Sequence, residues 1–249
     1  MDGKTFAKKT IQFLKQEADE RNVKAARLLA EGLLEGLVTE KDPDKVFQWL
    51  TLAADDGQAA ALTLLGACYQ FGQGVDPDPE KAAQCYSQGA ELGLTLAQRR
   101  LALLYKEGAL GSPDYDQAAF WFQKAALQDD PVALFNLAQM SLEGLGQPLD
   151  LEKAIEHYKK AAALGEAEAQ AALGLLFSLG QGVDQNLITA VEWWQKASAQ
   201  GHEGAQNYLA SLAEANLIVE RGTTETPNPP KPRAPKTPKT VKPKAPKKA

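Results

Sequence analysis

A repeat of 36 residues constrains the fold of this chain more than any other feature of its sequence. Five segments align without gaps, a partial sixth follows them, and they begin at Val23, Ala59, Thr95, Pro131, Ala167 and Glu203. The third position of every segment is alanine and the seventh is leucine, from Ala25 and Leu29 to Ala205 and Leu209. Self-similarity at a period of this length is typical of a solenoid built from one repeated helical unit.

Each repeat predicts a pair of helices joined by a short turn. Repeat positions 3, 7, 8 and 11 lie on one helical face, and position 8 is always alanine or glycine, which lets a neighbouring helix approach. Position 14 is suited to the left-handed end of the first helix because it is Gly36, Gly72, Gly108, Gly144 and Gly180. Position 20 can cap the second helix because it is Asp42, Asp78, Asp114, Asp150 and Asn186. Position 35, which ends the second helix, is Gly57, Gly93, Gly165 and Gly201, with Asp129 as the exception.

The chain is therefore predicted to be all-α, with a single elongated repeat domain and two different ends. Residues 1–22 are expected to form an N-terminal capping helix, approximately 4–21, which resembles a solitary second helix. Residues 23–220 form the solenoid, as repeats 23–58, 59–94, 95–130, 131–166 and 167–202 and a final solitary helix, 203–220. Residues 221–249 contain eight prolines and almost no bulky apolar side chain, so we expect a disordered tail there.

The repeat columns resemble the Sel-one-like repeat (SLR) family, which is related to the tetratricopeptide repeats. The match is clearest in Ala169–Gly201, which reads A-x-x-x-L-G-x-x-F-x-x-G-x-G-V-D and then A-x-x-W-W-x-K-A-x-x-x-G, and Ala61–Gly93 follows it. The first and third copies depart from the Gly-x-Gly turn at residues 36–39 and 108–111. The resemblance implies a right-handed α-solenoid whose first helices line a concave face, and an adaptor that binds peptides or assembles protein complexes. Some family members carry a disulfide in each repeat, but Cys68 and Cys85 occur in one repeat only.

The residues that could carry chemistry are better explained by the repeat. Gly72-Gln73-Gly74 and Gly180-Gln181-Gly182 follow helices rather than strands, so they fit turns and not a phosphate loop. His157 and His202 are read as structural residues, and Cys68 and Cys85 as small apolar side chains, with a redox pair as the alternative. No Ser/His/Asp set, metal cluster or carboxylate pair remains. We therefore expect no enzyme, no cofactor, no metal and no small-molecule substrate.

A candidate binding surface follows from the face of the first helices that is opposite the packing columns. Repeat positions 2, 5, 9 and 12 share this face, which lines the groove by resemblance to related repeats. In the middle repeats these positions combine apolar side chains with two cations, which suits an apolar peptide that carries an acidic group. The candidate residues are Arg99, Leu103, Lys106, Phe135, Gln139, Leu142 and Leu175. The alternative is that neighbouring helices bury Leu103 and Leu142, which would leave a blander surface.

The net charge of −5 conceals an acidic body and a basic tail. Residues 1–220 contain 18 Lys and Arg against 31 Asp and Glu, a net charge of −13, whereas residues 221–249 contain nine against one, a net charge of +8. A basic tail attracts phosphate backbones or anionic lipids without reading a base sequence. The residues that would do so are Lys231, Arg233, Lys236, Lys239, Lys242, Lys244, Lys247 and Lys248. A solvated tail and contact with the acidic body are the alternatives.

Two functional hypotheses follow from these observations. The first is a non-enzymatic scaffold whose solenoid binds a protein or peptide partner. The alternative is a protein associated with nucleic acid or an anionic membrane surface, tethered by its tail, with the solenoid recruiting partners. The N-terminal residues lack an uninterrupted apolar segment, so we expect no signal peptide there. No apolar run approaches the length of a membrane span, and two cysteines cannot stabilise a fold of this size through disulfides. A cytoplasmic location is therefore expected.

Overall fold

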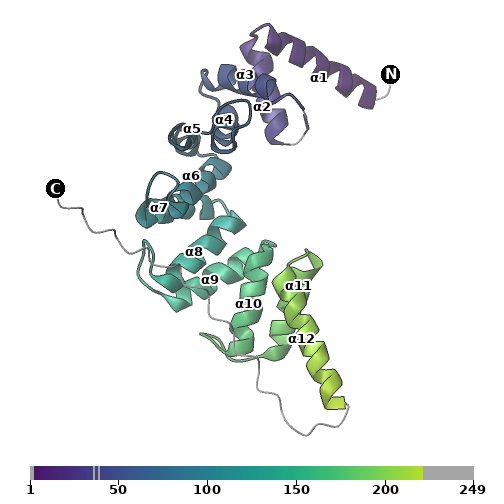
Figure 1. The fold of residues 1–249 in the computed structure, drawn as a ribbon, viewed down its shortest axis with the longest axis vertical. Coiled ribbons are helices and arrows are strands. Elements are labelled where there is room, and N and C mark those ends of the chain that lie inside the picture. The colour runs from purple at the N-terminus through teal and green to yellow at the C-terminus, as the bar shows by residue number, and fades with distance from the viewer. Residues whose placement is uncertain (1–2, 36, 39, 221–249) are drawn as a thin grey trace, which may run out of the picture. The chain divides into compact units, whose positions relative to one another are not determined.

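The computed structural model describes residues 3–35, 37–38 and 40–220, and within them the secondary structure is entirely helical. Within these residues twelve α-helices follow one another, joined by short turns (Figure 1). They are α1 (Gly3–Asp19), α2 (Val23–Leu34), α3 (Pro43–Ala54), α4 (Ala59–Phe71), α5 (Pro79–Glu91), α6 (Thr95–Glu107), α7 (Tyr115–Ala126), α8 (Pro131–Glu143), α9 (Leu151–Ala163), α10 (Ala167–Leu179), α11 (Leu187–Ala199) and α12 (Glu203–Glu220). The predicted all-α solenoid of helix pairs is confirmed.

Side-chain caps begin the second helix of every repeat, as the sequence pattern predicts. The carboxylates of Asp42, Asp78, Asp114 and Asp150 and the amide oxygen of Asn186 each accept a hydrogen bond from a backbone N–H in the first turn. Such caps satisfy amide groups that have no partner inside the helix, and each is worth about 1 kcal/mol. The single Asp or Asn at position 20 therefore fixes where the second helix begins.

Left-handed residues end the helices at the two predicted repeat positions. Gly72, Gly108, Gly144 and Gly180 follow the first helices with φ between 67° and 71°, and Gly36 lies outside the described residues. After the second helices, repeat position 35 is a glycine in four repeats and Asp129 in the third. Asp129 adopts the same left-handed conformation, with a φ of 59°. Because aspartate tolerates this region better than most side chains, the repeat keeps its geometry without glycine.

Close packing within a repeat depends on the small residue at position 8. A Cβ atom on Gly66 of α4 would lie 2.8 Å from the ring of Tyr86 on α5, and one on Gly174 of α10 would overlap the Trp194 indole of α11. Tyr86 is fully buried and Trp194 nearly so. The glycines thus make room for the large side chains of the second helix.

Each repeat also packs against its neighbours. α3 contacts α4, α5 contacts α6, α7 contacts α8 and α9 contacts α10, while α1 packs against α2 and α3. The turn of one repeat lies on the start of the second helix of the preceding repeat, since Gly74 lies against the carbonyl of Pro43 and Gly146 against that of Tyr115. The buried core consequently runs through consecutive repeats, with its largest cluster between α6 and α10.

The chain divides after Leu209 into two units. The first contains α1 to α11 and the beginning of α12, and the described part of the second is the remainder of α12, residues 210–220. Over the described residues, no helix combines the length and the apolar character that crossing a membrane requires.

Candidate peptide-binding surface

The candidate surface lies on the first helices α6, α8 and α10. Arg99, Leu103 and Lys106 come from α6, Phe135, Gln139 and Leu142 from α8, and Leu175 from α10. All seven side chains are half-buried, so each keeps part of its surface in solvent while it packs against the solenoid. The chemistry available to a partner therefore depends on which of their atoms are already engaged.

The cation of Arg99 already has a carboxylate partner. Arg99 Nη1 lies 3.3 Å from Asp130 Oδ2, and the Asp130 side chain is only 9% exposed. The other oxygen, Asp130 Oδ1, accepts a hydrogen bond of 2.8 Å from the backbone N–H of Ala133 and caps α8. Asp130 thus joins α6 to the beginning of α8, and the charge of Arg99 is compensated inside the protein.

Lys106 is held by amide oxygens and by no carboxylate of the described residues. Its Nζ donates hydrogen bonds to Asn136 Oδ1 at 2.6 Å and to Gln139 Oε1 at 3.1 Å, which links the C-terminal half of α6 to α8. Burial lowers the pKa of Lys106, and the carboxylates of Glu143 and Glu107 oppose this shift. The ammonium group is therefore partly desolvated without an opposite charge in contact.

The apolar side chains of the surface lie partly in solvent and partly against the core. Leu103, Phe135 and Leu142 all pack against the central hydrophobic cluster. The ring of Phe135 lies 5.8 Å from that of Tyr158 on α9, with a tilt of 52°. Burial by neighbouring helices, the alternative considered from the sequence, thus accounts for part of this surface, and the remainder is exposed to solvent.

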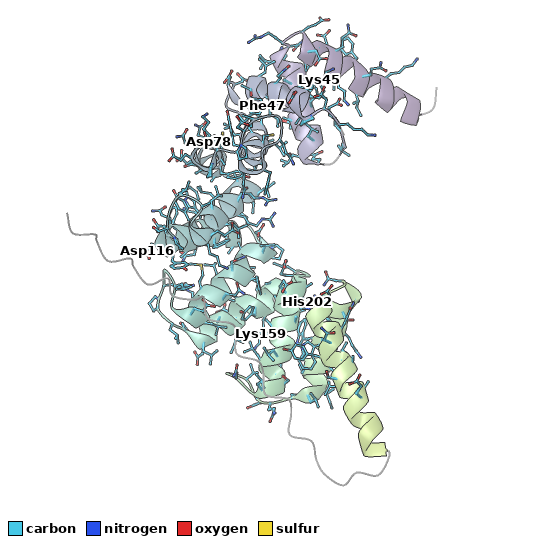
Figure 2. All side chains as sticks on the ribbon, in the orientation of Figure 1. Lys45, Phe47, Asp78, Asp116, Lys159 and His202 are labelled. Carbon is cyan, nitrogen blue, oxygen red and sulfur yellow. The ribbon has the colours of Figure 1, made fainter. Side chains whose placement is uncertain are left out.

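The repeat pattern did not reveal a set of polar side chains, Asp130, Glu166 and His202, that directly precede the first helices α8, α10 and α12. His202, labelled in Figure 2, accepts a hydrogen bond at Nδ1 from the backbone N–H of Ala205 at 3.0 Å. Its Nε2 lies 3.1 Å from Glu168 Oε2. Burial raises the pKa of the nearby Glu166 carboxyl, with additional contributions from Glu168 and Asp130 and an opposing one from Arg99. Asp130, Glu166 and His202 share repeat position 36. Because the residue type at this position varies among the repeats, aligning the repeats did not predict a functional residue there.

Other reactive side chains do not assemble into a reaction centre in the described part of the chain. Cys68 is buried and Cys85 is half-buried, both are free thiols, and burial raises the pKa of Cys68 to about 11. Burial also lowers the pKa of His157, whose buried Nδ1 has no hydrogen-bond partner among the described residues. No group of three or more His, Cys, Asp or Glu within these residues could hold a metal ion.

Two depressions of the described surface lie away from the candidate residues. One, of about 810 Å³, is at the turn between α10 and α11 and includes Phe177, Asp184 and Lys159 of α9 (labelled in Figure 2). The other, of about 420 Å³, lies between α1 and α3 beside Phe47 and Trp49. The tail residues Lys231, Arg233, Lys236, Lys239, Lys242, Lys244, Lys247 and Lys248 lie outside the described residues.

A solenoid of helix pairs with small residues at the contact and capped second helices defines a repeat protein of the SLR class. The family model for the Sel1 repeat matches residues 23–58, 59–94, 95–130, 131–166 and 167–202. This chain belongs to the Sel1 repeat family. Sel1 repeat proteins are generally protein-interaction scaffolds, and their fold is typical of non-enzymatic binding proteins.

Solved structures support the assignment. A Sel1 repeat protein from Oxalobacter formigenes is 30% identical, with a TM-score of 0.70 over 77% of this chain and 78% of that one. The protective antigen c5321 of uropathogenic Escherichia coli, which displays an SLR fold, is 28% identical, with a TM-score of 0.69 over 81% of this chain. The chain spans only 43% of the length of c5321. A putative Sel1 repeat protein from Klebsiella pneumoniae, 23% identical with a TM-score of 0.51, shares the fold. A search of curated proteins gave no match.

Proposed function

We propose that this chain is a non-enzymatic scaffold that binds a peptide or protein segment on the first-helix surface of α6, α8 and α10. The observation that carries the proposal is that Leu103, Phe135 and Leu142 all pack on the central cluster yet keep part of their surface in solvent. Apolar side chains that line an exposed helical surface gain free energy when a partner covers them. The free thiols of Cys68 and Cys85 fit a reducing compartment, and we place the scaffold in the cytoplasm.

A double substitution tests this surface. Leu103→Gln with Leu142→Gln should remove a partner captured by the immobilised full chain, because polar groups replace the apolar contact. The matched control is Phe120→Gln with Leu127→Gln, whose side chains are 47% and 81% exposed and lie outside the candidate surface. Helicity and the thermal midpoint are measured for both variants. A partner that still binds the first variant, or that is lost equally from both, contradicts the proposal.

The charge of the tail favours a second candidate function, attachment to an anionic surface. Residues 221–249 carry a net charge of +8 next to a body of opposite sign. Neutralising several phosphates with lysines produces binding that falls steeply as salt is raised. The full chain should therefore bind duplex DNA or anionic vesicles at low salt, and a chain ending at Glu220 should not. Equal binding by the two chains would exclude the tether.

A further inference from the structure

The unusual feature of the candidate surface is a partly desolvated lysine that lacks a carboxylate partner. Two other cations with little exposure, Lys15 and Arg99, are paired with Glu40 and Asp130 at 2.9 Å and 3.3 Å. Lys106 instead contacts two neutral amide oxygens, those of Asn136 and Gln139. An ammonium group has three N–H donors, so one remains for a ligand. Taking a charge partly out of water without an opposite charge leaves it favourable for an anion to bind.

The neighbouring amides add a second donor. Asn136 donates one N–H of its Nδ2 to the carbonyl of Val132 at 2.8 Å, and its Oδ1 accepts from Lys106. Gln139 directs its Oε1 toward Lys106, and its Nε2 has no partner among the described residues. A carboxylate placed above this pair can accept one hydrogen bond from Lys106 and one from Gln139. Charge-assisted hydrogen bonds of this kind are the stronger ones.

We propose that Lys106 and Gln139 bind the carboxylate of an Asp or Glu side chain that is flanked by apolar residues in the partner segment. This inference rests on the proposed function, since it names the chemistry of the same surface. Leu103 lies one turn before Lys106 on α6, and Leu142 lies beyond it on α8, so apolar contacts are available on both sides. An acidic residue inside the segment has apolar neighbours on both sides that can contact Leu103 and Leu142, whereas a C-terminal carboxylate has a neighbour on one side only.

Nearby charges restrict the anion to a singly charged group. Glu107 and Glu143 are exposed residues at the last positions of α6 and α8, and both influence Lys106 electrostatically. For a doubly charged phosphate the attraction of the single ammonium and the repulsion of the two carboxylates both double, whereas the cost of taking the anion partly out of water rises with the square of its charge. The structure therefore favours a carboxylate over a phosphorylated side chain. Arg99 does not contribute, because Asp130 already compensates it.

The experiment uses the immobilised full chain to select binders from displayed random peptides. The best binders are synthesised with blocked termini in two forms, with the acidic residue and with its amide. We expect selected sequences to be enriched in Asp or Glu between apolar residues, and the amide form to bind about tenfold more weakly, as for loss of a hydrogen bond to a charged group. Lys106→Met should weaken the acidic form by a similar factor and leave the amide form unchanged, because it removes the ammonium but keeps much of the apolar stem.

Three further variants make the test specific. Lys124→Met on α7 is the matched control and should bind both peptides as the wild type does, because its exposed ammonium lies over Phe120. Glu143→Gln should strengthen binding of the acidic form, because it removes a repelling charge. Circular dichroism and thermal unfolding establish that each variant is folded, and Gln139→Leu replaces Lys106→Met if the latter fails to fold.

The outcomes separate the two levels of the proposal. Peptides that need Leu103 and Leu142 but show no acidic preference and no loss with Lys106→Met leave the proposed function standing and overturn this inference. Peptides whose binding is insensitive to Leu103 and Leu142, or the absence of any binder, overturn both. An acidic preference that requires a free C-terminal carboxylate also overturns the assignment to an internal side chain.

Discussion

The indole ring of Trp194 on α11 stacks on the phenol ring of Tyr208 on α12, with centroids 4.7 Å apart and planes 15° from parallel. Trp194 is buried and also donates a hydrogen bond to the carbonyl of Ala171 at 3.3 Å, whereas Tyr208 is 41% exposed. Tyr208 belongs to the solitary helix that follows the last complete repeat. The stack therefore covers a side chain of the final repeat with the beginning of the terminal helix.

Removing this stack should loosen the beginning of α12. Tyr208→Ala should lower the local unfolding free energy by about 1 kcal/mol, the magnitude of an aromatic pair. Native-state hydrogen exchange at residues 203–209 is the appropriate measurement, because solenoid ends open locally. Ile188→Ala is the control, since that side chain on α11 is 75% exposed. Unchanged protection in Tyr208→Ala would show that the stack does not hold the helix.

A methyl group should not be tolerated at Gly66, although alanine is the better helix former. Its Cβ would lie 2.8 Å from the ring of the fully buried Tyr86. The helix propensity gained is about 1 kcal/mol, while overpacking a core typically costs about 1–3 kcal/mol. We expect Gly66→Ala to lower the midpoint of thermal or urea unfolding.

The first repeat provides a matched rescue for this variant. Ala30 occupies the position of Gly66 there, and Leu50 the position of Tyr86. Gly66→Ala should therefore be far less harmful in a Tyr86→Leu background, and a double-mutant cycle measures the difference. An equal loss in both backgrounds would mean that the tyrosine ring is not the obstacle.

His202 is expected to act as the cap of α12. Its Nδ1 accepts the hydrogen bond from the backbone N–H of Ala205, so His202→Ala should destabilise the beginning of the helix by about 1 kcal/mol. His202→Asn should retain most of the stability, because asparagine is a good cap. Glu168→Gln tests the other ring nitrogen, and we expect a small effect since Glu168 is 59% exposed. Hydrogen exchange at Ala205 distinguishes the variants. If asparagine protects no better than alanine, the cap is unimportant.

The repeated part of the fold was predictable because the same local chemistry recurs in every copy. Asp or Asn at position 20, glycine at position 14 and a small residue at position 8 each impose one geometric requirement, and the structure meets them at Asp78, Gly72 and Gly66. Even Asp129, the exception among the glycines, takes the left-handed conformation that its position demands. Because the local preferences of the residues agree with the architecture of the whole solenoid, its fold can be predicted from the sequence.

The partners of the surface residues could not be predicted in the same way. Arg99 pairs with Asp130 at the end of the same repeat, and Lys106 pairs with Asn136 and Gln139 of the following repeat. These residues occupy repeat positions where the residue type changes from one copy to the next, so an alignment of the copies shows no conserved column that would predict the pairs. Sequence spacing predicts which residues share a helical face, but which of their charges are already compensated depends on contacts about one period apart in the sequence.

The ion pair between Lys15 and Glu40 gives the stability of the N-terminal region a defined pH dependence. Lys15 Nζ lies 2.9 Å from Glu40 Oε2, and the two side chains are 25% and 20% exposed. The hydrogen bond from Lys15, with others from the backbone N–H groups of Lys41 and Asp42, lowers the pKa of Glu40 from 4.5 to about 2. A carboxyl group with a lowered folded-state pKa stabilises the fold above its unfolded value and loses that contribution as the pH falls toward the folded value.

The difference in unfolding free energy between the wild type and Lys15→Met should therefore depend on pH. We expect about 1 kcal/mol at neutral pH, because the pair is partly solvated, and a steady decrease as the pH falls from 4.5 to about 2. Urea unfolding across this range measures it, and taking the difference between two chains cancels the titration of the other carboxylates. Lys45→Met is the control, since its contact with Asp19 is longer, 3.6 Å, and both side chains are more than 40% exposed. A difference for Lys15→Met that stays constant with pH would mean that the lysine acts through packing on Trp49 rather than through the charge of Glu40.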